Sequence, residues 1–445
     1  MNADPESAAI HEQMRRVARE IFLGSLTDSS IERGFEKHIS YEHGILRVCD
    51  DLYDLGTFAR VFVVSIGKAA HTCVQALMDR LGAGTGATGI VCGPTEPPSQ
   101  VFGFRYYMGG HPLPNEHSVK SAEAILRSLR ALPPKSLVIF MLSGGGSALV
   151  EKPIDDEISL PDLIASYKAL VHSGAPIAEI NAVRKHLSAT KGGRLAVAAA
   201  PAHQVSIMIS DVPENALDSL ASGPTMPDST TVEQCYQIVK KYDLLPRFPA
   251  SVRELFERNA PEETPKAGDA EFANSRWWPI LSNASAQKSA VEQAAVAGLA
   301  VQIDNSCDDW DYKPAADFLL KKVRELRSGV SKVGLISGGE VTVTVKGEAG
   351  RGGRNQHFAA YCAKQIQGER IVVLSAGTDG IDGNSVAAGA IVDGTTMQRA
   401  HALGLNIELA MEKFDTEPLF RELGDIIETG PTGNNLRDLR ILIAY

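Results

Sequence analysis

Short apolar runs rich in Val, Ile and Leu recur along the chain, and stretches with helical spacing lie between them. Strands that are apolar on both sides are typical of a parallel sheet covered by helices on both faces. The predicted strands are Val61–Ile66, Thr88–Cys92, Ser136–Leu142, Val205–Ile209, Leu299–Ile303, Lys332–Ile336 and Ile371–Leu374. Helices are predicted at Ala69–Leu81, His117–Leu132 and Ala284–Ala297. The pattern predicts an α/β fold with open sheets.

The chain is long enough for two or three domains, since it has 445 residues. The segment 259–278 is polar, contains two prolines close together and has no sustained period, so we predict a linker or excursion there and a domain boundary near it. Another strand is predicted at Val341–Val345, leading into the glycine-rich cationic loop Lys346–Arg354. Each half then carries loops that follow strands.

Charge and composition exclude several classes of protein. The formal net charge is −10 and no block of Lys and Arg occurs, so nucleic acid is not expected as a partner. Six scattered cysteines without a CxxC pair argue against a disulfide framework or a zinc site and favour the cytoplasm. Met1–Ile10 lacks the pattern of a secretion signal, and no apolar run approaches the ~20 residues of a membrane helix. Glycine is over-represented, with 40 residues.

Many of these glycines follow predicted strands, where ligands of open α/β sheets collect. Lys68 follows Gly67 at the start of a helix. The helix dipole disfavours a cation at this position, and a bound phosphate would account for the lysine. The alternative is a solvated lysine on the surface. The loop Ser143–Ser147 (SGGGS) offers backbone amides and two hydroxyls to an anion, although a packing turn is the alternative. Neither segment matches a P-loop or a nucleophile elbow.

Acidic residues and arginines follow other predicted strands. Asp211 follows the predicted strand Val205–Ile209. Its carboxylate suits a proton acceptor or a metal ligand. The alternative is a structural role in a turn or as a helix cap. The later half contains Ser337–Glu340, Arg351–Gln356 and Ser375–Asn384, in which acids and arginines alternate with glycine. For Ser375–Asn384, a tight Asp-Gly turn is the alternative to a binding site. Together, anion sites, cations and acids without a Cys or His pair indicate phosphoryl transfer.

Several short motifs also follow one another in a distinctive order. In the first part of the chain they are Ser65–Ala70, Gly109–Pro114, Leu142–Leu149, Ile180–Ser188, Ser210–Pro213 and Ala221–Thr225. In the second part they are Ser337–Glu340, Gly353–Gln356 and Gly377–Gly380. This succession resembles the glycerate 2-kinase family, with a MOFRL domain at about residues 332–440. The likeness runs from about residue 10 to residue 445.

The resemblance implies an ATP-dependent kinase that phosphorylates D-glycerate at its 2-hydroxyl, giving 2-phosphoglycerate and ADP, with Mg²⁺ or another divalent cation. It implies a Rossmann-like N-terminal domain (8–258) and a smaller α/β C-terminal domain (279–445), with the active site in the cleft between them. Carried over by motif, the residues that line this cleft are Lys68, Asp211, Glu340, Arg354, Asp379 and Asn434. The choices between Arg351 and Arg354, and between Asn434 and Asn435, stay open.

Physical chemistry assigns roles to these candidates. Lys68 and Arg354 would neutralise charge on the transferred phosphoryl group, and Asp211 would orient the substrate hydroxyl and accept its proton. Asp379 and Asp382 suit Mg²⁺, which prefers carboxylate oxygens. The glycerate carboxylate would bind Arg184, Lys185 or the loop of Ser143, Gly144, Gly145, Gly146 and Ser147. His111, between glycines and prolines, is expected to be a structural turn residue.

Two other classes of function remain as alternatives. Older members of the family were named hydroxypyruvate reductases, but a G-x-G-x-x-G turn after a strand is missing, and Gly82–Gly86 follows a helix instead. A binding module for sugar acids would bind ligand without ATP turnover. A kinase for a related hydroxy acid also fits. The expected partners are small molecules, with no membrane, and the sequence leaves a homo-oligomer open.

Overall fold

The computed structural model describes residues 5–445, which form two compact units. The central unit is Phe35–Ile280, and the terminal unit combines Leu281–Tyr445 with the chain up to Gly34. The predicted ranges, 8–258 and 279–445, differ from these units mainly in the first helix, α1 (Pro5–Asp28), which packs in the terminal unit. The first four residues of the segment Met1–Ile10 lie outside the described residues.

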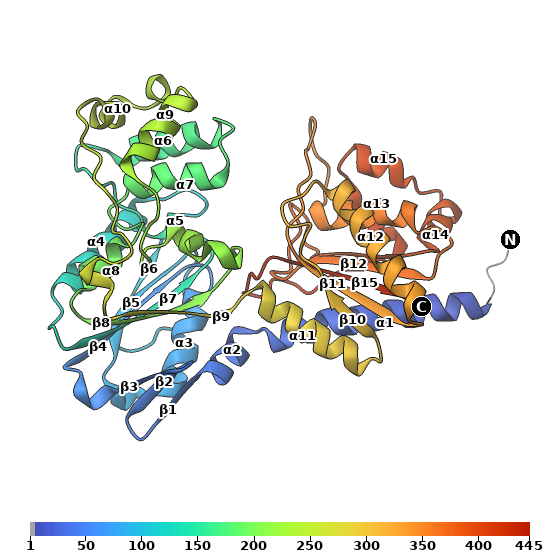
Figure 1. Ribbon diagram of the computed structural model, residues 1–445, viewed down its shortest axis with the longest axis horizontal. Coiled ribbons are helices and arrows are strands. Elements are labelled where there is room, and N and C mark those ends of the chain that lie inside the picture. The colour runs from blue at the N-terminus through green and yellow to red at the C-terminus, as the bar shows by residue number, and fades with distance from the viewer. Residues whose placement is uncertain (1–4) are drawn as a thin grey trace. The chain divides into compact units, whose positions relative to one another are not determined.

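The central unit is built on a six-stranded sheet with the order β6-β5-β4-β7-β8-β9 (Figure 1). Its strands are β4 (Arg60–Ile66), β5 (Thr88–Gly93), β6 (Phe104–Met108), β7 (Ser136–Ser143), β8 (His203–Ile209) and β9 (Ser275–Leu281). The five strands from β6 to β8 are mutually parallel. The four predicted strands of this unit are therefore confirmed, and their carboxyl ends meet at one edge of the sheet.

Helices cover both faces of this sheet. On one face α4 (Glu116–Arg130) and α8 (Arg194–Ala199) bury their apolar side chains, and α3 (Ala70–Leu81) lies on β4, β5 and β7. A capping box closes the start of α4, where Asn115 accepts a hydrogen bond from the Ser118 amide. A small antiparallel sheet pairs β1 (Ile39–Glu42), β2 (Ile45–Val48) and β3 (Asp51–Asp54).

A separate helical layer in the central unit was not predicted. It consists of α6 (Leu160–Val171), α7 (Ile177–His186), α9 (Val232–Lys241) and α10 (Ala250–Glu257), which share one apolar cluster. The short α5 (Gly146–Leu149) also lies in this unit, and α2 (Ile31–His38) spans the boundary between the two units.

The segment 259–278 is not a linker, because it packs against the central unit. The Thr264 hydroxyl donates to the buried Asp228 carboxylate at 2.9 Å, and Lys266 donates to Thr264 at 2.7 Å. The last residues of the segment, from Ser275 on, form strand β9. The two units separate between Ile280 and Leu281, a few residues beyond the polar segment.

The terminal unit contains a second six-stranded sheet, with the order β10-β11-β15-β12-β13-β14. Its strands are β10 (Ala300–Ile303), β11 (Val333–Gly339), β12 (Ile371–Gly377), β13 (Gly389–Asp393), β14 (Ile426–Ile427) and β15 (Asp438–Ala444). The strands at Leu299–Ile303, Lys332–Ile336 and Ile371–Leu374 are confirmed, but the sheet is mixed. Because β15 is antiparallel to both β11 and β12, those two strands still end at the same edge.

Two helical layers enclose this second sheet (Figure 1). One layer is α1 with α11 (Asn283–Val296), whose apolar side chains pack on β11, β12 and β15. The other contains α12 (Tyr312–Gly329), α13 (Arg354–Gln365), α14 (Thr396–Ala402), α15 (Ile407–Glu412) and α16 (Thr416–Leu423). The buried Arg15 of α1 forms ion pairs with Asp393 and Asp425, which fix this helix to the sheet.

The predicted strand Val341–Val345 is wrong. Strand β11 ends at Gly339, whose φ of +85° turns the chain away from the sheet. Only Thr342 keeps an isolated bridge, to Asp311, and the chain from there to Arg354 is an irregular loop. Alternating Val and Thr residues gave a strand pattern, but the sheet offers them no partner strand.

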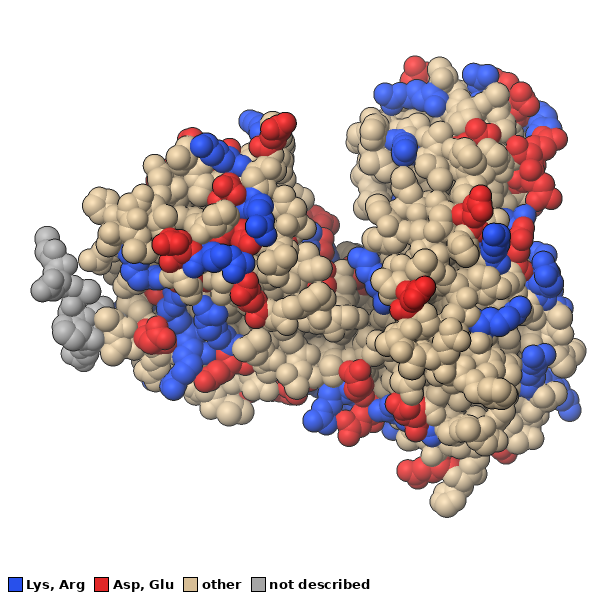
Figure 2. Space-filling view, turned by 180° about the vertical axis from the view of Figure 1, so that it is seen from behind, with Lys and Arg blue, Asp and Glu red and all other residues tan. Residues whose placement is uncertain are grey.

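Acidic and basic side chains both occur over the face drawn in Figure 2, and several basic side chains lie next to one another on one unit. Among residues 5–445, none of the helices combines the length and apolar character that a membrane crossing requires.

Candidate active site

Three predicted loops meet at the carboxyl edge of the central sheet. They follow β4, β7 and β8, which are adjacent in the sheet. The Lys68 amide donates to the Gly144 carbonyl at 2.9 Å, and the Ala69 amide donates to the Ser143 hydroxyl at 3.1 Å. The loop that carries Lys68 is therefore bonded directly to the glycine loop.

Glycine is required here because the loops approach each other closely. A β-carbon on Gly67, whose φ is +128°, would lie 2.1 Å from the Ser143 hydroxyl oxygen. A β-carbon on Gly144 would lie 2.0 Å from a carboxylate oxygen of Asp211. Real side chains cannot approach so closely, so the Asp211 carboxylate rests against backbone that only glycine leaves accessible.

Lys68 and His111 flank the next glycine of the loop. A β-carbon on Gly145 would lie 3.2 Å from the Lys68 Cγ and 3.0 Å from a His111 ring carbon. Lys68 is exposed to solvent. Partial desolvation and the nearby Lys68 charge lower the pKa of His111. The structure thus brings Lys68, Asp211 and the glycine loop together and adds His111 to their surroundings.

A buried ion pair that the sequence did not reveal supports the glycine loop. Lys191 and Glu151 form a short contact, and both side chains are almost fully inaccessible to solvent. Lys191 also donates to the Ser147 carbonyl at 2.8 Å. Glu151 accepts from Tyr167 at 2.7 Å and from Ser188 at 2.5 Å. The pair is therefore fully hydrogen-bonded and fixes the end of the loop at Ser147.

The two adjacent cations of α7 differ in their surroundings. Arg184 lies over the Tyr167 ring, 4.8 Å from its centroid, and is half-buried. Lys185 is buried and pairs with Asp218 at 3.1 Å and Asp228 at 3.0 Å. These ion pairs occupy Lys185 within the fold, so Arg184 is the better candidate to bind a substrate carboxylate.

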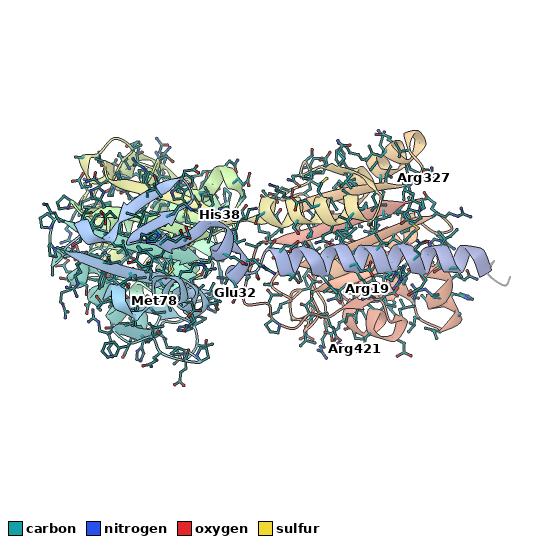
Figure 3. The ribbon with its side chains drawn as sticks, turned by 90° about the horizontal axis from the view of Figure 1, so that it is seen from below. Arg19, Glu32, His38, Met78, Arg327 and Arg421 are labelled. Carbon is teal, nitrogen blue, oxygen red and sulfur yellow. The ribbon has the colours of Figure 1, made fainter. Side chains whose placement is uncertain are left out.

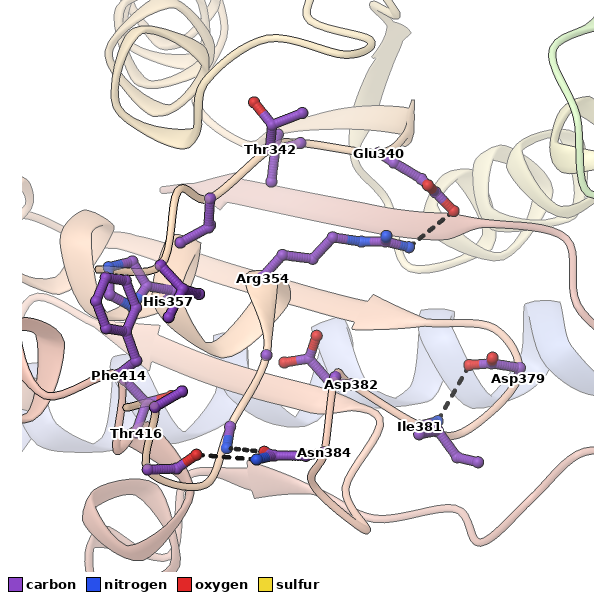
Figure 4. A pocket seen from close by; sticks show the side chains of 18 of the residues that line it. Glu340, Thr342, Arg354, His357, Asp379, Ile381, Asp382, Asn384, Phe414 and Thr416 are labelled. Atoms are coloured by element: carbon purple, nitrogen blue, oxygen red, sulfur yellow. Dashed lines mark hydrogen bonds and ion pairs between the residues drawn. The ribbon is translucent and has the colours of Figure 1, made fainter. Parts of the chain in front are cut away.

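A pocket of about 720 Å³ in the terminal unit is lined by most of the candidates from the second half of the chain. Glu340, Arg354, Asp379 and Asp382 all contribute to its walls (Figure 4). These residues come from the loops after β11 and β12 and from the start of α13. The convergence of these loops is the arrangement that the sequence predicted for this half.

Arg354 is fixed at the centre of this pocket by two carboxylates. Its guanidinium donates to both oxygens of Asp438, at 2.6 and 3.0 Å, and pairs with Glu340 at 2.7 Å. Burial alone would lower the pKa of Arg354, but the Asp438 hydrogen bonds and charge reverse this and raise it. Burial raises the pKa of Glu340, against the opposing charge of Arg354. Arg354 is thus a permanent, oriented cation.

The members of the two paired alternatives lie in different surroundings. Arg351 is exposed and pairs with Glu417 at 3.1 Å, whereas Arg354 lines the pocket. Asn435 lines the pocket too. The Asn434 side chain instead donates from Nδ2 to the Ser29 carbonyl at 2.6 Å, in the chain just after α1.

The two predicted metal ligands have different surroundings. Asp382 is buried and accepts hydrogen bonds from the amides of Asn355 (3.0 Å) and Gln356 (2.9 Å), so it caps α13. Burial raises the pKa of Asp382 to about 7, although those amides oppose the shift. Asp379 is only partly buried and accepts from the Ile381 amide at 3.1 Å. Within residues 5–445, His, Cys, Asp and Glu form no group of three that could hold a metal ion.

One end of the pocket is aromatic and is lined by Phe414 and His357. Val341, Val343 and Val345 also contribute to the pocket walls. The rings of His357 and Phe414 are stacked, with centroids 5.2 Å apart. Burial lowers the pKa of His357 to about 4, so its ring is neutral. In Figure 4 this end lies on one side of Arg354, and Glu340 and Asp379 lie on the other.

Removing one partner of the Glu151–Lys191 pair should destabilise the central unit. In Lys191→Met the Glu151 carboxylate stays buried without its cation, and we expect a loss of about 3–5 kcal/mol in the free energy of unfolding, measured by urea denaturation. Lys152→Met, whose cation pairs with an exposed Asp156, is the control and should cost less than about 1 kcal/mol. The double variant Glu151→Gln/Lys191→Met should regain at least half of the loss. A double variant no more stable than Lys191→Met would contradict the account.

The chain matches two known protein families over separate ranges. A domain of unknown function, DUF4147, matches residues 17–257, and the MOFRL family matches residues 333–438. The glycerate 2-kinase of Pyrococcus horikoshii is 34% identical over 86% of this chain and 87% of its own. The D-glycerate 2-kinase of Thermotoga maritima is 36% identical over 86% of this chain and 90% of its own. An Agrobacterium vitis relative, 35% identical over 86% of this chain and 87% of its own, carries the provisional name of a hydroxypyruvate reductase.

Solved structures extend the likeness to the whole fold. The crystal structure of glycerate kinase from Thermotoga maritima has a TM-score of 0.85, is 33% identical, and the match covers 98% of this chain and all of that chain. A protein from Pyrococcus horikoshii has a TM-score of 0.83 and is 31% identical, with 97% and 98% of the two chains covered. Because these matches exceed 30% identity and extend over nearly the whole length of both chains, this chain belongs to the glycerate 2-kinase family.

Proposed function

We propose that the protein transfers the γ-phosphoryl group of ATP to the 2-hydroxyl of D-glycerate, giving 2-phosphoglycerate and ADP. The observation that carries this proposal is the full-length similarity to two relatives named as glycerate 2-kinases. The geometry supports it, because phosphoryl transfer needs oriented cations and amides more than covalent chemistry. The choice of the 2-hydroxyl rests on the names of the relatives. A cytoplasmic location belongs to the proposal, in keeping with six dispersed cysteines.

In this proposal, the residues of the central unit act mainly on D-glycerate, which accepts the phosphoryl group. The 2-hydroxyl of glycerate donates a hydrogen bond to the Asp211 carboxylate, which accepts the proton as the new P–O bond forms. The amides of Gly144–Ser147 and the Arg184 guanidinium bind the glycerate carboxylate. Lys68, beside Gly145, neutralises charge on the transferred group.

The pocket of the terminal unit suits the nucleotide. Its volume of about 720 Å³ lies within the range of small-molecule sites. The polar end, with Arg354, is suited to phosphate oxygens, because its guanidinium is a fixed positive charge that attracts them. The aromatic end, with Phe414 and the neutral His357, is suited to a base and ribose.

A divalent cation fits this proposal through Asp379. Mg²⁺ is commonly held by one or two carboxylates together with substrate phosphates, so a protein cage of three ligands is not required. When bound, the ion neutralises charge on the phosphate oxygens. Asp379 is the more accessible of the two predicted ligands, and Asp382 holds the start of α13 beside it.

The purified protein tests the function directly. We expect ADP formation that depends on D-glycerate, ATP and Mg²⁺, measured with a coupled enzyme assay, and ³¹P NMR should identify the product as 2-phosphoglycerate. Hydroxypyruvate with NADH is the comparison and should give no turnover. NADH oxidation without any glycerate-dependent ADP formation would replace the kinase by the reductase.

Variants in each unit test the proposed residues. Lys68→Ala and Arg354→Lys should each lower kcat by about 10²–10³-fold, because the first removes a positive charge from the transferred group and the second loses the planar guanidinium that Asp438 orients. Arg351→Lys changes a neighbouring arginine that pairs at the surface and should keep kcat within twofold of the parent value. A kcat near normal in Lys68→Ala or Arg354→Lys would remove that residue from the mechanism. Far-UV circular dichroism confirms that each variant is folded.

A further inference from the structure

Asn283, the first residue of α11, has a side chain that the start of the helix does not need. Helix α11 lies beside α1 in the terminal unit and begins two residues after the boundary between the units (Figure 3). Asparagine near a helix start commonly caps the helix. Here Ser282 occupies the cap position, and its amide donates to the Ser285 hydroxyl at 2.9 Å. The Asn283 side chain, which is only 8% exposed, forms its hydrogen bonds elsewhere.

The carboxamide of Asn283 joins the ends of two strands. Its Nδ2 atom donates to the Asp438 carbonyl at the start of β15 (3.0 Å) and to the Leu436 carbonyl just before it (2.6 Å). Its Oδ1 atom accepts from the Gly339 amide at the end of β11 (3.0 Å). The same oxygen accepts from the side chain of Gln287, one turn further along α11. All four bonding positions of the carboxamide are therefore in use.

Two of these partners bear directly on Arg354, which lines the pocket proposed for the nucleotide. Asp438 holds its guanidinium through both carboxylate oxygens. Gly339 precedes Glu340, which pairs with the same guanidinium. Because Asn283 bonds the backbone of both Asp438 and Gly339, it fixes the spacing of the two strand ends from which the carboxylates reach Arg354.

Neighbouring side chains hold Asn283 in this position. Gln287 is buried, and its Oε1 atom accepts from the Asn305 side chain at 2.9 Å. The Gly338 amide of β11 in turn donates to the Asn305 side chain at 2.9 Å. A β-carbon on Gly338 would overlap the side chains of Asn283 and Gln287, so both amides pack directly against the strand backbone. A connected network of this kind holds its members in one arrangement.

We propose that Asn283 is a positioning residue for the nucleotide. By joining the ends of β11 and β15, it holds Glu340 and Asp438 at the spacing that orients Arg354 toward the phosphates of ATP. A misplacement of about 1 Å can cost about 10²-fold in rate, so a small shift of these strand ends is sufficient. The inference rests on the proposed function, and Asn283 acts through other residues rather than by touching the nucleotide.

Steady-state kinetics and ADP binding in Asn283 variants test the proposal. Asn283→Ala removes all four bonds. Asn283→Asp keeps the size of the side chain but turns an oxygen toward the Asp438 and Leu436 carbonyls. We expect each variant to lower kcat by about 10–10²-fold and to raise the KM for ATP by about 5–10-fold. The Kd for ADP, measured by calorimetry with Mg²⁺, should rise equally, and the KM for D-glycerate should stay within twofold.

Ser289→Ala is the matched control. Ser289 lies on the same helix, is only 6% exposed and donates to the Asp28 carboxylate at the end of α1 (2.8 Å), not to a strand end. Its loss should lower the melting temperature without changing either nucleotide constant. Unfolding reduces the fraction of active enzyme and therefore the measured kcat, but it leaves KM and Kd unchanged. A change in those constants therefore separates positioning from a purely structural role.

Each outcome decides the matter. Unchanged ATP and ADP constants in a folded Asn283→Ala protein, or an equal rise in Ser289→Ala, would overturn the proposal. Should Asn283→Ala fail to fold, Gln287→Leu, which removes one of the four bonds, should still raise the Kd for ADP about two- to threefold, and an unchanged Kd there would overturn it. A parent protein that binds ADP without glycerate-dependent turnover would refute the proposed function alone, because a weaker ADP affinity in Asn283→Ala would still support the positioning role.

Discussion

The candidate nucleotide pocket depends on one strand, β15, that runs antiparallel between β11 and β12. Its first residue, Asp438, lies opposite Gly339 at the end of β11 and opposite Gly377 at the end of β12. This position puts a buried carboxylate at the point where the two strand-end loops diverge. Asp438 then holds Arg354 bidentately, and Arg354 in turn holds Glu340. Since β15 aligns both neighbouring strands, the loops that carry Glu340 and Asp379 emerge at the same edge.

In the central unit, too, the loops that carry candidate residues meet at one edge of the sheet. Its strands are parallel, so their loops meet at one edge without an intervening strand. Close packing then requires glycine, since Asp211 and Ser143 occupy the space that side chains at Gly144 and Gly67 would need. A buried ion pair gives little net stability, because the cost of removing water from both charges offsets their attraction. The main effect of Glu151 and Lys191 is therefore to fix the geometry of the loop that ends at Ser147.

The local pattern of apolar residues was enough to predict most of the central strands of both sheets. The seven apolar runs are strands, and the loops after them hold Lys68, Asp211, Arg354 and Asp379. The missed strand β15 depends on distant pairing. In β15, Arg440 interrupts the apolar run that follows Asp438, and this arginine is fully buried, so the segment resembles neither a polar nor an apolar strand. Val341–Val345 is the opposite error. Its residues alternate as in a strand, but no neighbouring strand pairs with them. Nothing near Glu151 in sequence points to Lys191, because their contact forms only in the fold.

The central claim is that Asp438 orients Arg354 for phosphoryl transfer, and steady-state kinetics of Asp438→Asn tests it most directly. An amide keeps the shape of the side chain but loses the charge that holds the guanidinium, so we expect kcat to fall by about 10²-fold while the KM for D-glycerate stays within threefold. Melting temperature, measured alongside, reports whether the fold is retained. A folded Asp438→Asn enzyme with kcat within twofold of the parent value would contradict the account.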